Sequence, residues 1–189
     1  MKIKELELDI DGVYEPREDS FLLANIVEEK SHGDVLDIGT GSGIQALTAS
    51  KTAKSVTGVD IRKKAVKTAE INAKRNNIKN VVFKQSNLFE DVSGKFDLII
   101  FNPPYLPEKQ GLYKDSEQWA GGETGREVIE KFSLEAKDHL KDNGKILMVI
   151  SSLTGLEEVK KIFLKLDFSV NVIKEKKIPW EMLYVLEIL

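Results

Sequence analysis

Residues 35–43 read Val-Leu-Asp-Ile-Gly-Thr-Gly-Ser-Gly, and this stretch decides the fold because an apolar run passes directly into a glycine-rich turn. The apolar run predicts a short buried strand at 35–38, and a helix is expected to begin near Ile44. In such a turn the backbone can pass close to a ligand. A dinucleotide-binding fingerprint would need glycine in place of Ile44, and a phosphate-binding P-loop would need a Gly-Lys-Ser/Thr ending, so neither fits.

The rest of the chain continues the alternation of strands and helices. A first helix is expected to run to Val27 with Asp19 or Ser20 as its cap, and a turn is expected at 142–144. Strands joined through helices imply right-handed crossovers and a mainly parallel sheet. We therefore predict a Rossmann-like α/β fold with a seven-stranded, mainly parallel sheet, a C-terminal antiparallel hairpin, and helices on both faces. The expected strands are 35–38, 55–60, 81–83, 96–101, 145–150, 168–173 and 182–188, and the later helices are 62–75, 125–140 and 155–166.

Composition limits the chemistry. The chain has 189 residues, a net charge of -3 and no cysteine, which excludes a thiol nucleophile, a disulfide and a thiolate metal site. The two histidines, His32 and His139, are interpreted as structural or solvated, and no metal site is expected. No signal peptide or run of 18 apolar residues is evident. We predict one cytoplasmic domain over residues 1–189 with a short N-terminal arm over about 1–30.

A second informative stretch, Asn102-Pro103-Pro104-Tyr105, follows the expected strand 96–101. Chemistry in an open α/β sheet gathers at the carboxyl ends of its strands. The two prolines remove N–H donors but keep carbonyl acceptors, while Asn102 adds an acceptor and Tyr105 a flat ring. Such a group can hold a planar amide NH₂ or an exocyclic base NH₂. The alternative is a proline-rich turn after a core strand.

Residues 37–43 resemble motif I of the class I methyltransferases that use S-adenosylmethionine. The resemblance implies that Asp37 lies near the amino-acid part of the cofactor. It also implies that Gly39, Gly41 and Gly43 let the backbone approach the nucleoside.

Two further cofactor contacts are expected at the ends of the next strands. Asp60 lies about twenty residues after motif I, where a carboxylate can accept both ribose hydroxyls. Asn87 and Leu88 occupy the place where methyltransferases hold adenine. Many relatives have aspartate where this chain has Asn87, so the contact would use the amide oxygen without a charge-assisted bond.

Four segments together narrow the resemblance, namely residues 13–20, 37–43, 102–105 and 119–127. Their order and spacing resemble the HemK/PrmC family of protein-glutamine N5-methyltransferases. The resemblance is stronger to its short archaeal and eukaryotic branch, called Mtq2-like. The bacterial branch carries an N-terminal helical domain, and too little sequence precedes motif I here to hold one.

The family resemblance implies methylation of the glutamine in the Gly-Gly-Gln loop of a class I translation release factor, with S-adenosylmethionine as methyl donor. The Asn102 oxygen and the Pro103 carbonyl would accept the two amide hydrogens and Tyr105 would pack on the amide plane, so positioning would carry the rate. These three are the predicted catalytic residues. The predicted substrate contacts are Asn102, Pro103, Pro104, Tyr105 and Trp119, and Ser20 and Asn102 complete the predicted cofactor contacts.

Two alternative functions have to be considered, and one partner subunit is expected. An adenine-N6 or guanine-N2 methyltransferase of RNA or DNA would use the same turn, and the lysine-rich segment 63–74 is a candidate phosphate-binding face. A non-catalytic cofactor-binding subunit conflicts with the intact Asn102–Tyr105 turn. Members of the Mtq2-like branch often work with a small zinc-binding activator, Trm112-like in kind. We expect such a subunit to pair with an apolar edge strand at Val81–Phe83.

Overall fold

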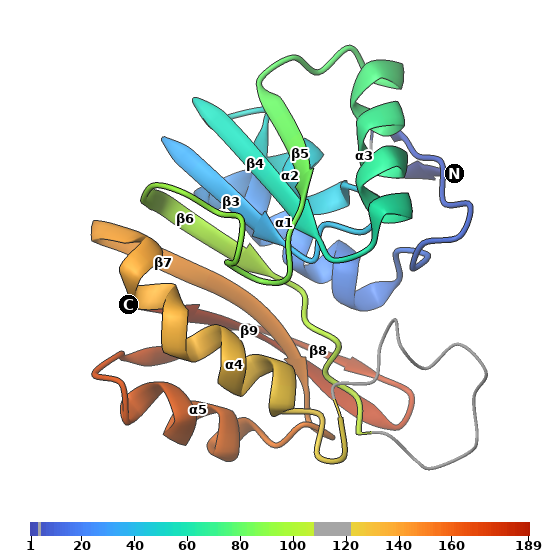
Figure 1. The fold of residues 1–189 in the computed structure, drawn as a ribbon. Helices are drawn as coiled ribbons and strands as arrows, with labels where there is room; N and C mark the ends of the chain where they lie inside the picture. The colour runs from blue at the N-terminus through green and yellow to red at the C-terminus, as the bar shows by residue number, and fades with distance from the viewer. Residues whose placement is uncertain (4, 108–121) are drawn as a thin grey trace.

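The computed structural model describes residues 1–3, 5–107 and 122–189, so the predicted substrate contact Trp119 lies outside the described residues. Figure 1 shows the described part as a sheet with helices packed on it. In chain order the elements are β1 (Lys2–Ile3), β2 (Leu6–Glu7), α1 (Glu18–Lys30), β3 (Asp34–Ile38), α2 (Ile44–Ala49), β4 (Ser55–Asp60), α3 (Lys63–Arg75), β5 (Val81–Gln85), β6 (Phe96–Phe101), α4 (Glu127–Ala136), η2 (Lys137–His139), β7 (Leu140–Ser151), α5 (Leu156–Leu164), β8 (Val170–Ile178) and β9 (Glu181–Ile188).

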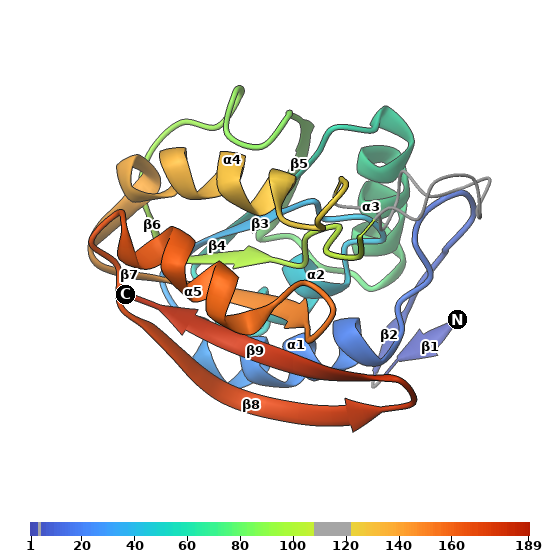
Figure 2. The ribbon, with the colours of Figure 1, turned by 90° about the horizontal axis from the view of Figure 1, so that it is seen from below.

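The main sheet has seven strands in the order β5-β4-β3-β6-β7-β9-β8. Neighbouring strands from β5 to β7 are parallel, whereas β9 is antiparallel to both β7 and β8. The β8–β9 hairpin forms one outer edge of the molecule in Figure 2. The predicted Rossmann-like sheet with a C-terminal antiparallel hairpin is therefore confirmed.

Helices cover both faces of the sheet, which explains why the central strands are almost continuously apolar. On one face Leu23 and Val27 of α1 pack with Leu98 of β6. On the other face Phe132 of α4 is stacked on Phe101 of β6, with 4.6 Å between ring centroids. Each fully buried side chain of this size contributes roughly 1.5–3 kcal/mol through removal from water. Helices α4 and α5 lie in front of the sheet in Figure 1 and α1 lies behind it.

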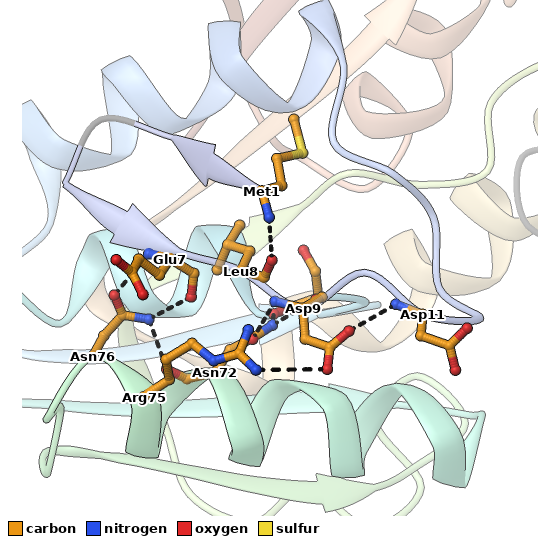
Figure 3. A network of polar contacts seen from close by, with 9 residues as sticks. Met1, Glu7, Leu8, Asp9, Asp11, Asn72, Arg75 and Asn76 are labelled. Atoms are coloured by element: carbon orange, nitrogen blue, oxygen red, sulfur yellow. Dashed lines mark hydrogen bonds and ion pairs between the residues drawn. The ribbon is translucent and has the colours of Figure 1, made fainter.

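The N-terminal arm is fastened to α3 by two asparagine side chains (Figure 3). Asn72 accepts from the Asp9 N–H at 2.6 Å and donates to the Asp9 carbonyl at 2.9 Å. Asn76 makes the same pair of bonds with Glu7, each at 2.9 Å. Each amide thus bonds both the N–H and the carbonyl of one arm residue, as a neighbouring strand would do. The backbone of this arm is therefore hydrogen-bonded although the arm has little regular secondary structure.

Two local expectations are wrong. Helix α1 begins at Glu18 after Arg17, so Asp19 and Ser20 lie inside its first turn, buried, and neither is the cap. The turn expected at 142–144 is part of β7, where a register shift against β6 absorbs the extra residues. Lys141 holds this irregular stretch because its ammonium bonds Asp34 at 2.8 Å and Asp97 at 2.7 Å.

Candidate functional site

A cavity of about 310 Å³ opens at the carboxyl ends of the parallel strands, where open α/β sheets bind their ligands. Its size suits a small molecule. Eight of the residues predicted from the sequence line it, namely Ser20, Gly39, Gly41, Asp60, Asn87, Leu88, Asn102 and Pro104. The predicted residues Asp37, Gly43, Pro103 and Tyr105 are not among the lining residues.

The glycine-rich turn between β3 and α2 is held by contacts with β4 and α3. The Gly41 N–H donates to the Asp60 carboxylate at 3.0 Å, which ties the turn to the end of β4. Gly43 has φ of +85° and lies so close to α3 that an added Cβ would stand 3.2 Å from the Ala69 Cβ. The carbonyl of Ser42 accepts from Asn72 of α3 at 2.8 Å. Gly41 therefore lines the cavity in a fixed backbone position.

Asp37 lies beneath this turn. Its carboxylate accepts from the Thr40 hydroxyl at 2.6 Å and from the Ala46 N–H at 3.1 Å. Burial raises the pKa of Asp37 to about 7 although both of these bonds act in the opposite direction. In this position Asp37 braces the turn from below, and its direct contact with a cofactor stays a prediction.

The ends of β4 and β5 supply acceptors on one side of the cavity. Asp60 is buried, and it accepts from the Gly41 N–H and from the Arg62 N–H at 2.9 Å. An ionised carboxylate has about four acceptor positions, so capacity for two hydroxyl donors remains. Asn87 is exposed and its NH₂ donates to Glu90 at 2.8 Å, so its amide oxygen is the end that has no bond to the described residues.

Leu88 has φ of +50°, a left-handed conformation that is uncommon for a residue with a branched side chain. Ser86 stabilises this turn, since its hydroxyl donates to the Leu88 carbonyl at 2.9 Å and accepts from the Asp91 N–H at 3.0 Å. Both Leu88 and Ser86 line the cavity. The strained turn therefore presents backbone and an apolar side chain to the position predicted for adenine.

Asn102, at the end of β6, has its orientation fixed by the first turn of α1. Its amide nitrogen donates to the Asp19 carboxylate at 3.0 Å and to the Ser20 hydroxyl at 3.3 Å. A carboxylate only accepts, so the group facing Asp19 must be the NH₂ of the amide. The other end, the buried Oδ1, has no hydrogen-bond partner among the described residues. Asn102 therefore lines the cavity and carries a buried acceptor that is unpaired in the described part of the chain.

Two tyrosines adjoin this arrangement. The Tyr14 hydroxyl donates to Asp19 at 3.1 Å, and burial together with the charge of Asp19 raises the pKa of Tyr14, so it remains a donor. Tyr105 is buried, and burial followed by the same charge raises its pKa as well. The Tyr105 carbonyl is fixed by the Thr154 hydroxyl at 2.8 Å. These contacts lock the exit from β6, as two prolines in the same turn would lead one to expect.

The lining residue Gln45 was missed from the sequence. Tyr14 and Ser86 also line the cavity, and the sequence placed them only within segments expected to lie near the cofactor, 14–20 and 86–89. Asp19 was interpreted as a candidate helix cap, and its contact with Asn102, 83 positions away, was not predicted. The available signal was a run of polar residues before an apolar helix. That run indicates a helix start equally well.

The described ranges contain no group of three or more His, Cys, Asp or Glu side chains arranged to hold a metal ion. The same ranges contain no helix that is both long and apolar enough to cross a membrane. What the site does offer is a set of hydrogen-bond acceptors around one cavity. Asp60 and Asn87 lie on one side and Asn102 on the other, an arrangement that can orient a ligand with several N–H and O–H donors.

Comparison with known proteins agrees with this geometry. Residues 17–178 match the family model described as Methyltransferase small domain. A protein of Methanocaldococcus jannaschii that carries the provisional name protein N5-glutamine methyltransferase is 44% identical over 178 residues, which are 92% of this chain and 90% of that protein. A release factor glutamine methyltransferase of Fusobacterium nucleatum is 33% identical over 87% of this chain, and the match spans 51% of that bacterial relative.

A solved structure supports the same fold. The E. cuniculi Mtq2–Trm112 complex, described as responsible for methylation of the eRF1 translation termination factor, superposes with a TM-score of 0.75. That alignment covers 93% of this chain and 97% of the other at 24% identity, so it shows the fold alone.

Proposed function

Since the chain belongs to the methyltransferase small domain family, we propose that it transfers a methyl group from S-adenosylmethionine to the side-chain amide nitrogen of a protein glutamine. The target we propose is the glutamine of the Gly-Gly-Gln loop of a class I translation release factor. The relatives named as glutamine methyltransferases support this substrate class. A substrate that works on the ribosome would place the reaction in the cytoplasm.

The lining residues fit the proposed cofactor. Asp60 would accept the ribose hydroxyls, and Asn87 would accept from the adenine amino group through its oxygen while Leu88 contacts the ring. The glycine turn at 39–43 would pass beneath the nucleoside. When bound, the cofactor supplies an activated methyl group.

One observation carries the proposal: the buried Oδ1 of Asn102 has no partner among the described residues, while its NH₂ is held by Asp19 and Ser20. Leaving a buried acceptor unpaired costs roughly 1–3 kcal/mol, so a ligand donor at this point is favoured. An amide NH₂ has two such donors. We propose that the first goes to Asn102 Oδ1 and the second to the Pro103 carbonyl, as the family resemblance implies.

This arrangement would supply the rate through orientation. An amide nitrogen is a poor nucleophile because its lone pair is delocalised. Two fixed acceptors would hold the amide plane so that one face of the nitrogen points toward the methyl group, and such positioning can be worth several kcal/mol. The predicted contact of Tyr105 with the amide plane belongs to the same proposal.

A partner subunit is proposed for the β5 edge. β5 is the edge strand of the sheet, and Val82 on it is 59% exposed. An apolar edge strand with unpaired backbone groups can be extended by a strand from another protein. The solved Mtq2–Trm112 complex supports a small subunit of that kind as the partner. Co-purification of such a subunit, and its loss on Val82→Lys, would test the proposal.

The proposed activity is tested by transfer of a labelled methyl group to the cognate release factor, with an intact or Gln-replaced Gly-Gly-Gln loop, and to total tRNA and rRNA. Label on the intact factor alone is the expected result. Label in RNA and not in the factor would transfer the assignment to an adenine-N6 or guanine-N2 methyltransferase, because an exocyclic amine can use the same two acceptors. No label in any of them would overturn both.

A further inference from the structure

Gln45 of α2 lines the cavity, and its side chain is 3% exposed. Its amide nitrogen donates to the Ser20 carbonyl at 3.0 Å. A carbonyl oxygen only accepts, so this contact fixes which end of the amide is NH₂ and which is oxygen. The remaining atom, Oε1, is buried and has no hydrogen-bond partner among the described residues.

Gln45 thus repeats the arrangement of Asn102 with a second amide. Ser20 connects the two, since its carbonyl accepts from Gln45 and its hydroxyl accepts from Asn102. Both amides turn their NH₂ toward the first turn of α1, and neither oxygen has a partner within residues 1–3, 5–107 and 122–189. A buried polar atom without a partner is rare in native proteins and calls for a ligand or an ion as the explanation.

The position of Gln45 indicates which ligand group it meets. The strand order β5-β4-β3-β6 places Asn87 and Asp60 toward one end of the cavity and Asn102 toward the other. Through Ser20, Gln45 belongs to the Asn102 end. Beyond the adenine amino group and the ribose hydroxyls, the α-ammonium group is the remaining N–H or O–H donor of S-adenosylmethionine.

We propose that Gln45 Oε1 accepts a hydrogen bond from this α-ammonium group, which makes Gln45 a specificity-determining residue for the amino-acid end of the cofactor. This inference rests on the proposed function. Because the NH₂ of Gln45 is committed to Ser20, the side chain presents only an acceptor. The cofactor's carboxylate, which also only accepts, is excluded from that position.

Calorimetric binding tests the proposal without any need for activity. Three ligands are compared: S-adenosylhomocysteine, the same compound without its α-amino group, and 5′-methylthioadenosine, which lacks the whole amino-acid part. Gln45→Met should bind S-adenosylhomocysteine about tenfold to hundredfold more weakly, the range for a lost bond to a charged group. Its affinity for the other two ligands should stay within about twofold of the wild type.

Thr48→Val is the matched control. Thr48 lies on the same helix and is buried, and its hydroxyl donates within α2 to the Ile44 carbonyl at 2.7 Å. This variant should bind all three ligands as the wild type does. Gln45→Glu loses the donor to the Ser20 carbonyl, as Gln45→Met does, but keeps an oxygen acceptor whose charge attracts the ammonium group. It should therefore retain more affinity for S-adenosylhomocysteine than Gln45→Met, and it is the second variant if Gln45→Met does not fold.

Each other outcome contradicts a different statement. Equal weakening of all three ligands by Gln45→Met would make Gln45 a structural residue. If Gln45→Met weakened the binding of S-adenosylhomocysteine and of its analogue without the α-amino group equally, but not that of 5′-methylthioadenosine, Gln45 would contact the carboxylate group. That result would overturn the ammonium contact. Failure of the wild type to bind S-adenosylhomocysteine at all would overturn the proposed function itself.

Discussion

Asn72 and Asn102 carry the same side chain and use it in opposite ways. Asn72, fully buried on α3, donates to the carbonyls of Asp9 and Ser42 and accepts from the Asp9 N–H. Asn102, at the end of β6, donates to Asp19 and Ser20 and leaves its oxygen without a partner among the described residues. The first amide is complete within the fold, while the second needs something from outside it.

The difference separates stability from function. A hydrogen-bonded buried amide contributes to the folded state, whereas an unpaired buried acceptor reduces its stability by roughly 1–3 kcal/mol. An arrangement that weakens the fold is expected where a ligand supplies the missing bond. The arm network around Asn72 in Figure 3 is therefore a structural device, whereas we propose that the cavity beside Asn102 binds a ligand.

The largest expected effect is on catalysis by Asn102→Ala. Removal of the acceptor releases the substrate amide from its orientation, so methyl transfer should fall about 100-fold to 1000-fold. S-adenosylhomocysteine affinity, measured by calorimetry, should change only severalfold, since Asp60 and the glycine turn remain. Methyl transfer at the wild-type rate would sink the proposed geometry.

A smaller catalytic effect is expected from Asp19→Asn, because Asp19 acts through Asn102. An amide at position 19 has one acceptor oxygen where the carboxylate has two, and the donors from Asn102 and Tyr14 then compete for it. The NH₂ of Asn102 is therefore held less firmly and can turn toward the cavity. We expect kcat to fall about tenfold with little change in KM for the methyl donor.

Tyr14→Phe is the control for Asp19→Asn. It removes a donor to the other carboxylate oxygen and leaves the contact with Asn102 in place, so its effect on kcat should be clearly weaker. An equal loss of kcat in both variants would argue that Asp19 matters for packing and not for the orientation of Asn102.

Whether a structural feature can be predicted from the sequence depends on how far apart along the chain the contacting residues lie. The runs at 35–38 and 96–101, with the turns that follow them, predict β3, β6 and the edge of the sheet that carries the cavity. They do so because burial and turn chemistry are local properties of the chain. The contact between Asp60 and Gly41 follows from the same βαβ unit and spans only 19 positions.

Contacts between distant segments could not be predicted in this way. The bond from Asn102 to Asp19 crosses 83 positions, and the bonds from Asn72 to Asp9 cross 63. A single polar residue in a helix carries no pattern that names its partner. Residues 142–144 show the converse, since pairing of β7 with β6 overrides a local turn signal.

The structural role of Asn72, in contrast to Asn102, is tested by Asn72→Ala. It leaves the Asp9 backbone groups and the Ser42 carbonyl without their partner, so the free energy of unfolding in urea should fall by about 2 kcal/mol. Asn76→Ala, whose bonds to Glu7 are more exposed to water, should cost less. Asn102→Ala should also cost less than Asn72→Ala, and the reverse order would break the contrast between the two amides.

The last expected effect is a pH dependence and concerns Asp37, whose pKa is raised by burial to about 7 from an ordinary value of 3.8. Between these two values the folded state binds more protons than the unfolded state, so ionisation of Asp37 lowers stability as pH rises. The free energy of unfolding of the wild type minus that of Asp37→Asn should decline from pH 4 to pH 7, by at most about 1.4 kcal/mol per pH unit.

Asp34 gives the opposite sign and so controls for general effects of pH. Hydrogen bonds from Lys141 and Ser55 hold the pKa of Asp34 below its ordinary value. The contribution of Asp34 to stability is present above that ordinary pKa and is lost as pH falls. The free energy of unfolding of the wild type minus that of Asp34→Asn should therefore rise with pH across the acidic range. Because Asp34 is partly exposed, solvent weakens this slope. Parallel slopes for the two differences would mean that burial does not set the protonation of Asp37.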